Sequence, residues 1–179
     1  MARGHDVISC DFLPSEDNSP HHYQGDCFDL INDQHFDLMI AHPPCTDIAV
    51  SGAAWFKEKI ADGRQQRALD FVRRLMNCGI PRICIENPVS VISSKIRKPD
   101  QIIQPWMFGH MEQKATCLWL TGLPKLTQTN NVKEEMLLLP KNVRERLHYL
   151  PPGPDRWKER SRTYQGIADA FAEQFGGVL

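Results

Sequence analysis

The sequence predicts an α/β fold with a largely parallel sheet, and three observations support this prediction. Short apolar runs typical of strands recur along the chain, helical or loop segments separate them, and several of the runs end at polar residues. The 179 residues suit a single domain over residues 1–179, and 41% hydrophobic with 24% charged side chains is an ordinary globular composition.

The expected elements follow one another with short connections. The strands are expected at residues 6–11, 23–26, 36–42, 82–86 and 115–120, the first of them buried. Between the third and fourth strands, residues 62–78 carry apolar side chains at helical spacing, and Gly79 ends the helix. A last amphipathic helix is expected at residues 163–175. The polar, Pro-rich segment 127–160 has one short helical stretch near 140–148, and we interpret it as a small insertion or recognition segment.

Four of the expected strands end at residues suited to binding or catalysis. These ends are Asp11, Asp26, the turn that leads to Cys45, and Glu86. In open α/β sheets, ligands bind outside the carboxyl ends of the strands. We therefore expect these four ends to converge on one edge of the sheet.

Cys45 is the candidate nucleophile. It follows an apolar strand and two prolines, Pro43 and Pro44, which hold the backbone extended and direct the thiol away from the sheet. Its expected partner is Glu86, a strand-end carboxyl that can donate or accept a hydrogen bond. The alternative for Cys45 is an inert core thiol. The six cysteines form no CxxC pair and no cluster with zinc-finger spacing, so no metal ligand is assigned.

Pro44-Cys45 after one strand and Glu86-Asn87-Pro88 after the next resemble motifs IV and VI of the DNA cytosine C5 methyltransferases. More narrowly, the chain is similar over nearly its whole length to small methyltransferase-like proteins of phages. The resemblance implies a Rossmann-like fold that uses S-adenosylmethionine, and methyl transfer to carbon 5 of cytosine in DNA. In such a reaction the Cys45 thiolate adds to carbon 6 of a flipped-out cytosine while Glu86 holds N3 and the exocyclic amine.

The same resemblance assigns further residues to binding. It implies that Asp11 contacts the ribose of S-adenosylmethionine, that Asp26 contacts its adenine, and that Pro43 lines the cofactor site. Residues 114–120 loosely resemble the strand of motif VIII, without its paired arginines, and residues 162–168 lead into a helix as the family's last motif does. Contacts with substrate or DNA are then expected from four residues, Asn87, Lys114, Arg160 and Arg162.

The chain departs from the family pattern at its start. The family opens with a strand and a glycine-rich turn that holds the methionine part of the cofactor, and nothing here matches that turn. Residues 1–5 resemble the end of the helix that follows it. The first strand of the fold would then be missing through a truncated start, supplied by a second chain or a homodimer, or lost together with cofactor use.

The charge distribution and the apolar pattern bear on partners. Residues 1–90 carry 8 basic and 13 acidic side chains, a net charge of −5, whereas residues 91–179 carry 13 and 9, a net charge of +4. This asymmetry fits a C-terminal half that contacts the phosphates of double-stranded DNA, with a solvated charged face as the alternative. No apolar run has the length of a membrane-spanning helix or a signal peptide, so we expect a soluble, cytoplasmic protein.

Two other functions stay open. A catalytically inactive DNA-binding or decoy protein with a methyltransferase-derived fold would explain the missing glycine-rich turn. An amino-methyltransferase acting on adenine N6 or cytosine N4 is disfavoured, because those enzymes carry an aromatic residue where this chain has Cys45.

Overall fold

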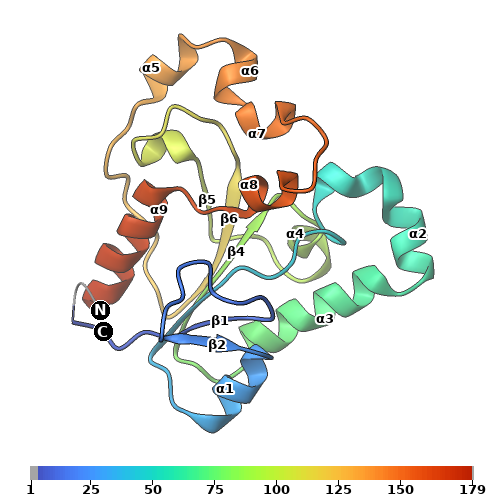
Figure 1. Cartoon of the computed structure of the whole chain (residues 1–179), viewed down its shortest axis with the longest axis vertical. Coiled ribbons are helices and arrows are strands. Elements are labelled where there is room, and N and C mark those ends of the chain that lie inside the picture. The colour runs from blue at the N-terminus through green and yellow to red at the C-terminus, as the bar shows by residue number, and fades with distance from the viewer. Residues whose placement is uncertain (1–3, 179) are drawn as a thin grey trace.

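The computed structural model describes residues 4–178 and shows a mixed α/β fold with two separate sheets (Figure 1). The larger sheet has the strand order β3-β4-β6-β5 and the smaller one pairs β1 with β2. The strands are β1 (Ser9–Asp11), β2 (His22–Gln24), β3 (Leu38–Ala41), β4 (Arg82–Pro88), β5 (Gln101–Ile103) and β6 (Thr116–Thr121).

The expectation of a largely parallel sheet is wrong for the larger sheet. Only β3 and β4 run parallel in it, whereas β6 is antiparallel to both β4 and β5. Parallel neighbours need a long crossover such as the one through α3 (Arg64–Met76), between β3 and β4. Between β4 and β6 the chain instead makes the short helix α4 (Ile92–Lys95), a 3-10 turn and the three-residue strand β5, which the sequence analysis did not find.

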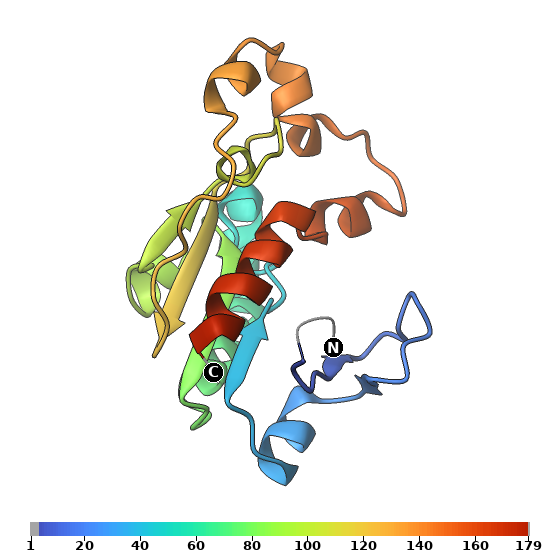
Figure 2. The same cartoon turned by 90° about the vertical axis from the view of Figure 1, so that its left-hand side faces the viewer.

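The first two strands form a small parallel sheet of their own. In Figure 2 these dark blue strands stand apart from the larger sheet. The first expected strand is correct in position but shorter than expected, and it is not buried, since Ser9 and Asp11 are exposed. The expected strand at residues 23–26 ends at Gln24, and Asp26 instead begins a helix, α1 (Cys27–Asp33), that was not predicted.

Helices cover both faces of the larger sheet (Figure 1). On one face, Leu69, Val72 and Leu75 of α3 pack with Ile83 and Ile85 of β4. The helix expected at residues 62–78 is thus confirmed as α3. On the other face, the alternate strand residues Cys84 and Leu118 pack with the C-terminal helix. That helix is α9 (Gln165–Ala170), which continues as a π-helical turn over Phe171–Phe175, so the expected last helix is also confirmed.

The remaining helices are short and lie outside the sheet. A 3-10 turn (Val50–Trp55) and α2 (Phe56–Ala61) precede α3, and a second 3-10 turn (Pro105–Met107) follows β5. Segment 127–160 contains α5 (Lys133–Leu137), α6 (Lys141–Arg144), α7 (Arg146–Tyr149) and the start of α8 (Arg156–Ser161), in place of one helical stretch. A final 3-10 turn covers Gly176–Val178.

At the start of the chain, residues 1–3, part of the expected helix end at residues 1–5, lie outside the described residues. The described residues that follow, Gly4 and His5, are not helical. Within residues 4–178, no helix is long and apolar enough to cross a membrane.

Candidate functional site

The candidate site lies where β3 and β4 end side by side. These strands are parallel and pair Ala41 with Ile85, so their carboxyl ends leave the same edge of the sheet. Beyond Cys45 and Pro88 the two exits stay joined, because the Val50 N–H donates to the Val89 carbonyl at 3.0 Å and the Val91 N–H to the Ile48 carbonyl at 3.0 Å.

The loop that carries Cys45 is fixed by the residues that follow it. The Cys45 carbonyl accepts the backbone N–H groups of Ile48, at 3.1 Å, and Ala49, at 2.8 Å, and both of these side chains are buried. The buried Lys59 of α2 donates to the Thr46 carbonyl and lies 3.5 Å from the Asp47 carboxylate. Anchors on both sides of the loop therefore hold the half-buried Cys45 in place.

Two side-chain hydrogen bonds tie the β3 exit to β4. The buried Asn87 amide donates from Nδ2 to the Pro43 carbonyl at 2.8 Å, and His42 Nδ1 lies 2.8 Å from Glu86 Oε2. The strand register explains both contacts, since His42 and Pro43 directly follow the pair of Ala41 with Ile85. Asn87 was expected to contact the substrate and Pro43 to line the cofactor site. In the structure they bind each other.

Burial raises the pKa of the Cys45 thiol above its ordinary value, and the negative charge of Glu86 raises it further. Hydrogen bonding to the backbone and the positive charges of Lys114 and Arg160 act in the opposite direction. The net shift is upward, so the resting thiol is protonated at neutral pH. The thiol must lose its proton before it can act as a nucleophile.

Lys114 and Arg160 bring positive charge to this thiol from distant parts of the chain. Burial lowers the pKa of Lys114, and the charges of Glu86 and Cys45 oppose that effect. The Lys114 ammonium donates to the Arg160 carbonyl at 2.9 Å and lies 5.9 Å from the centre of the Tyr164 ring. The structure therefore brings Cys45, Glu86, Lys114 and Arg160 into one electrostatic group.

A narrow cavity opens beside Glu86. It is lined by residues of β4, of segment 114–116 at the start of β6, and of segment 161–167 from the end of α8 into α9, namely Glu86, Lys114, Thr116, Ser161, Arg162, Thr163, Tyr164 and Ile167. Its volume is about 10 Å³, roughly the space of one water molecule. Arg162 lines the cavity, but its guanidinium also lies 3.5 Å from the exposed Glu16 carboxylate. The cavity is too small for a ring the size of a nucleobase.

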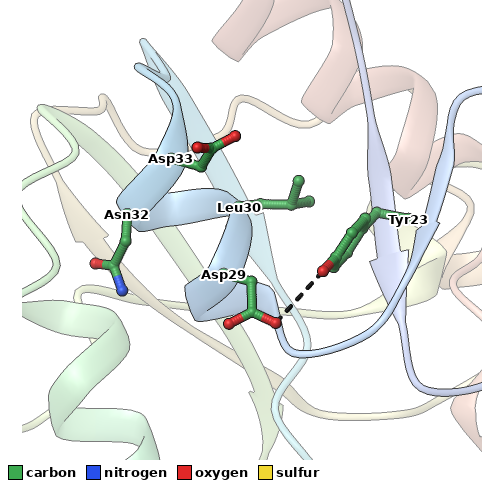
Figure 3. Close-up of a pocket in the computed structure, with 5 residues that line it drawn as sticks. All are labelled: Tyr23, Asp29, Leu30, Asn32 and Asp33. Carbon is green, nitrogen blue, oxygen red and sulfur yellow. Dashed lines mark hydrogen bonds between the residues drawn. The ribbon is translucent and has the colours of Figure 1, made fainter.

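The expected cofactor residues Asp11 and Asp26 have local roles. An Asp11 carboxylate oxygen accepts the Leu13 N–H at 2.9 Å, and an Asp26 oxygen accepts the Phe28 N–H at 2.9 Å as the N-cap of α1. A cavity of about 410 Å³ lies near these two residues, at β2 and α1 (Figure 3). Its lining residues are Tyr23, Asp29, Leu30, Asn32 and Asp33, so it contains none of the three expected cofactor residues.

The partner of His42 is the feature of this site that the sequence analysis did not predict. His42 is separated from Glu86 by 44 positions, and no local pattern marks it as a partner of a carboxyl. The signal that would have identified it is the register of β3 against β4, which the sequence alone does not provide.

Comparisons with known proteins do not assign the chain to a family. No protein-family model matches the chain, and neither a curated protein nor a solved structure gives a significant match.

Proposed function

We propose that this chain carries the cytosine-addition chemistry of a cytosine C5 DNA methyltransferase, with Cys45 as the nucleophile and Glu86 as its partner. The observation that carries the proposal is the meeting of these two residues at the exits of two paired parallel strands. A thiol, a carboxyl that can carry a proton and two cations that favour the thiolate, all within electrostatic reach, suit addition to a ring that is activated by protonation.

The addition follows from the chemistry of the ring. The Cys45 thiol passes its proton to the Glu86 carboxylate, and the sulfur forms a bond to carbon 6 of cytosine. The electron pair of the 5,6 double bond shifts to the bond between carbons 4 and 5, the pair of the double bond between carbon 4 and N3 moves onto N3, and N3 takes the proton from Glu86. The product is a covalent adduct in which carbon 5 is nucleophilic, and Lys114 and Arg160 favour the thiolate that starts the step.

S-adenosylmethionine is the methyl donor that the resemblance implies, but the expected cofactor residues do not fit it in this structure. Asp11 and Asp26 bind neighbouring backbone groups, Pro43 is buried against Asn87, and these residues line no common cavity among those described. Methyl transfer to carbon 5 stays part of the proposal only as the reaction that the addition chemistry prepares.

The addition step can be tested without any cofactor. Reversible attack at carbon 6 lets carbon 5 exchange its hydrogen with water, so DNA containing [5-³H]cytosine should release tritium. We expect release with the unaltered chain, none with Cys45→Ala, and at least ~10²-fold slower release with Glu86→Gln, the scale of one acid–base group. Cys78→Ala is the matched control and should behave like the unaltered chain. No release from double-stranded or single-stranded DNA would refute the proposal.

A second candidate is a DNA-binding or decoy protein that keeps the fold without the reaction. The lack of a formed cofactor site among the described residues favours it. Binding of duplex DNA that weakens steeply with salt, together with no tritium release, would support this candidate. Micromolar binding of S-adenosylmethionine in a calorimeter would argue against it and would restore a cofactor to the first proposal.

A further inference from the structure

We propose that His42 is a positioning residue for Glu86, and that it determines which oxygen of the Glu86 carboxyl faces the reacting base. This inference rests on the function proposed above and adds a residue that neither the motifs nor the resemblance includes. It begins from the 2.8 Å separation of His42 Nδ1 and Glu86 Oε2.

The contact joins an exposed group to a half-buried one. The His42 side chain is 44% exposed, whereas that of Glu86 is 17% exposed. His42 is thus the more exposed partner, and Glu86 also lines the cavity beside Lys114. The hydrogen bonds found among residues 4–178 include none to the second oxygen, Oε1. That oxygen is free for a ligand.

A hydrogen bond donated by His42 makes the two oxygens of the Glu86 carboxyl chemically different. When the Nδ1–H donates to Oε2, that oxygen acts as an acceptor, so a proton carried by the carboxyl is placed on Oε1. Oε1 is then the oxygen that can donate to N3 of cytosine during addition. Without His42, the carboxyl would rotate between two equivalent arrangements, only one of which presents its proton to the base.

The backbone around His42 suits this role. His42 directly follows β3 and precedes Pro43, whose carbonyl is held by the buried Asn87 amide. The other titratable groups that interact with Glu86 come from β4 itself, from β6 and from the segments next to β3 and β6, and are Cys45, Cys84, Lys114 and Cys117. Burial raises the pKa of each of these thiols, so they are neutral at pH 7, and Lys114 is the cation among them.

Two amide substitutions separate positioning from simple loss of a side chain. The side-chain nitrogen of Asn overlays Nδ1 of histidine, whereas that of Gln overlays Nε2, so only His42→Asn keeps a donor at the right place. In the tritium-release assay we expect His42→Asn to stay within about threefold of the unaltered chain, and His42→Gln and His42→Ala to fall ~10²-fold. His35→Asn is the control, because His35 is an exposed histidine whose acidic neighbour is Asp37.

A second readout needs no activity at all. In protein labelled with ¹⁵N-histidine, the ring nitrogen shifts of His42 should show the Nδ1–H tautomer near pH 7, and Glu86→Gln should change that pattern while His35 is unaffected. Equal rates for the Asn and Gln variants, or an unchanged tautomer in Glu86→Gln, would overturn the proposal. If the unaltered chain releases no tritium, the proposed function fails, and the tautomer pattern alone then decides whether His42 orders this carboxyl.

Discussion

At the scale of single residues, the reactivity of Cys45 depends on a balance of burial and charge. Burial raises the pKa of its thiol, Glu86 adds to the rise, and Lys114 and Arg160 counter it. A thiol in this state is almost fully protonated at neutral pH. It is therefore expected to react slowly with small reagents.

This balance predicts how Cys45 reacts with iodoacetamide. Only the thiolate is alkylated, so the rate at Cys45 should keep rising as the pH increases beyond 9.0, the ordinary pKa of a thiol. At pH 8, Glu86→Gln should speed alkylation and Lys114→Met should slow it, each by about twofold to fivefold, because a tenfold change in thiolate corresponds to one pKa unit.

The measurement is peptide mass spectrometry after timed alkylation, which separates Cys45 from the other five cysteines. Lys125→Met, which removes an exposed lysine outside the site, is the control and should leave the Cys45 rate unchanged. If both charge changes shift the rate in the same direction, the electrostatic group described here does not control the thiol.

At the scale of elements, Asp26 was expected to contact a cofactor and is instead the N-cap of the short helix α1. Its carboxylate caps the seven-residue helix α1 through the Phe28 N–H, and Phe28 lies in the core against Phe71 with ring centres 5.8 Å apart. We therefore expect Asp26→Ala to lower the free energy of unfolding by about 1 kcal/mol. Asp26→Asn keeps an acceptor at the cap and should cost less. Urea denaturation measures both, and equal stability of all three proteins would contradict a capping role.

The sequence predicted those elements whose signal is local. The apolar runs of β3, β4 and β6 and the helical spacing of α3 identify them without any tertiary information. The strand β5 and the helix α1 were missed, because three residues in one case and seven in the other are too short for a periodic pattern. The antiparallel direction of β6 could not be read from its residues, since both directions use the same apolar run.

The same distinction applies to the candidate site. Cys45 and Glu86 were expected to meet because the carboxyl ends of parallel neighbours share an edge, and the pairing of β3 with β4 brings them there. Asp11 and Asp26 were placed with them on the assumption of one continuous sheet. Because β1 and β2 form a sheet of their own, these acids do not join Cys45 and Glu86. The contact of His42 with Glu86 was not predicted for the opposite reason, since only the register reveals it.

At the scale of the whole molecule, β3 is an apolar strand with one open edge. Leu38 and Ile40 pack against the core that includes α9, and Met39 and Ala41 against the core that includes α3, so both faces of the strand are covered. All four residues are nevertheless only half-buried. Their exposure must come from the edge opposite β4, since β4 is the only strand with which β3 pairs among residues 4–178. An uncharged edge of this kind is a template for another strand.

Hydrogen exchange can show whether that edge is open in solution. In an edge strand, alternate backbone N–H groups point toward the partner and away from it. We therefore expect the amides of Leu38–Ala41 to alternate between slow and fast exchange, while those of residues 83–85 in β4 and 116–118 in β6, where the strands are paired on both sides, are all slow. The amides of the two-stranded β1–β2 sheet should exchange faster than those of β4, because so small a sheet is marginally stable by itself.

The alternative outcome has a definite structural meaning. Uniformly slow exchange along Leu38–Ala41 would show that a further strand pairs with β3, which is what a second chain or a homodimer completing the sheet requires. If that protection weakens on dilution and Ile40→Lys abolishes it, the added strand comes from another copy of the chain. If the protection is independent of concentration, the added strand belongs to the same molecule, and β3 has no open edge. A strand added at this edge would run directly beside the loop that holds Cys45, so the tritium-release rate should follow the same concentration dependence as the protection.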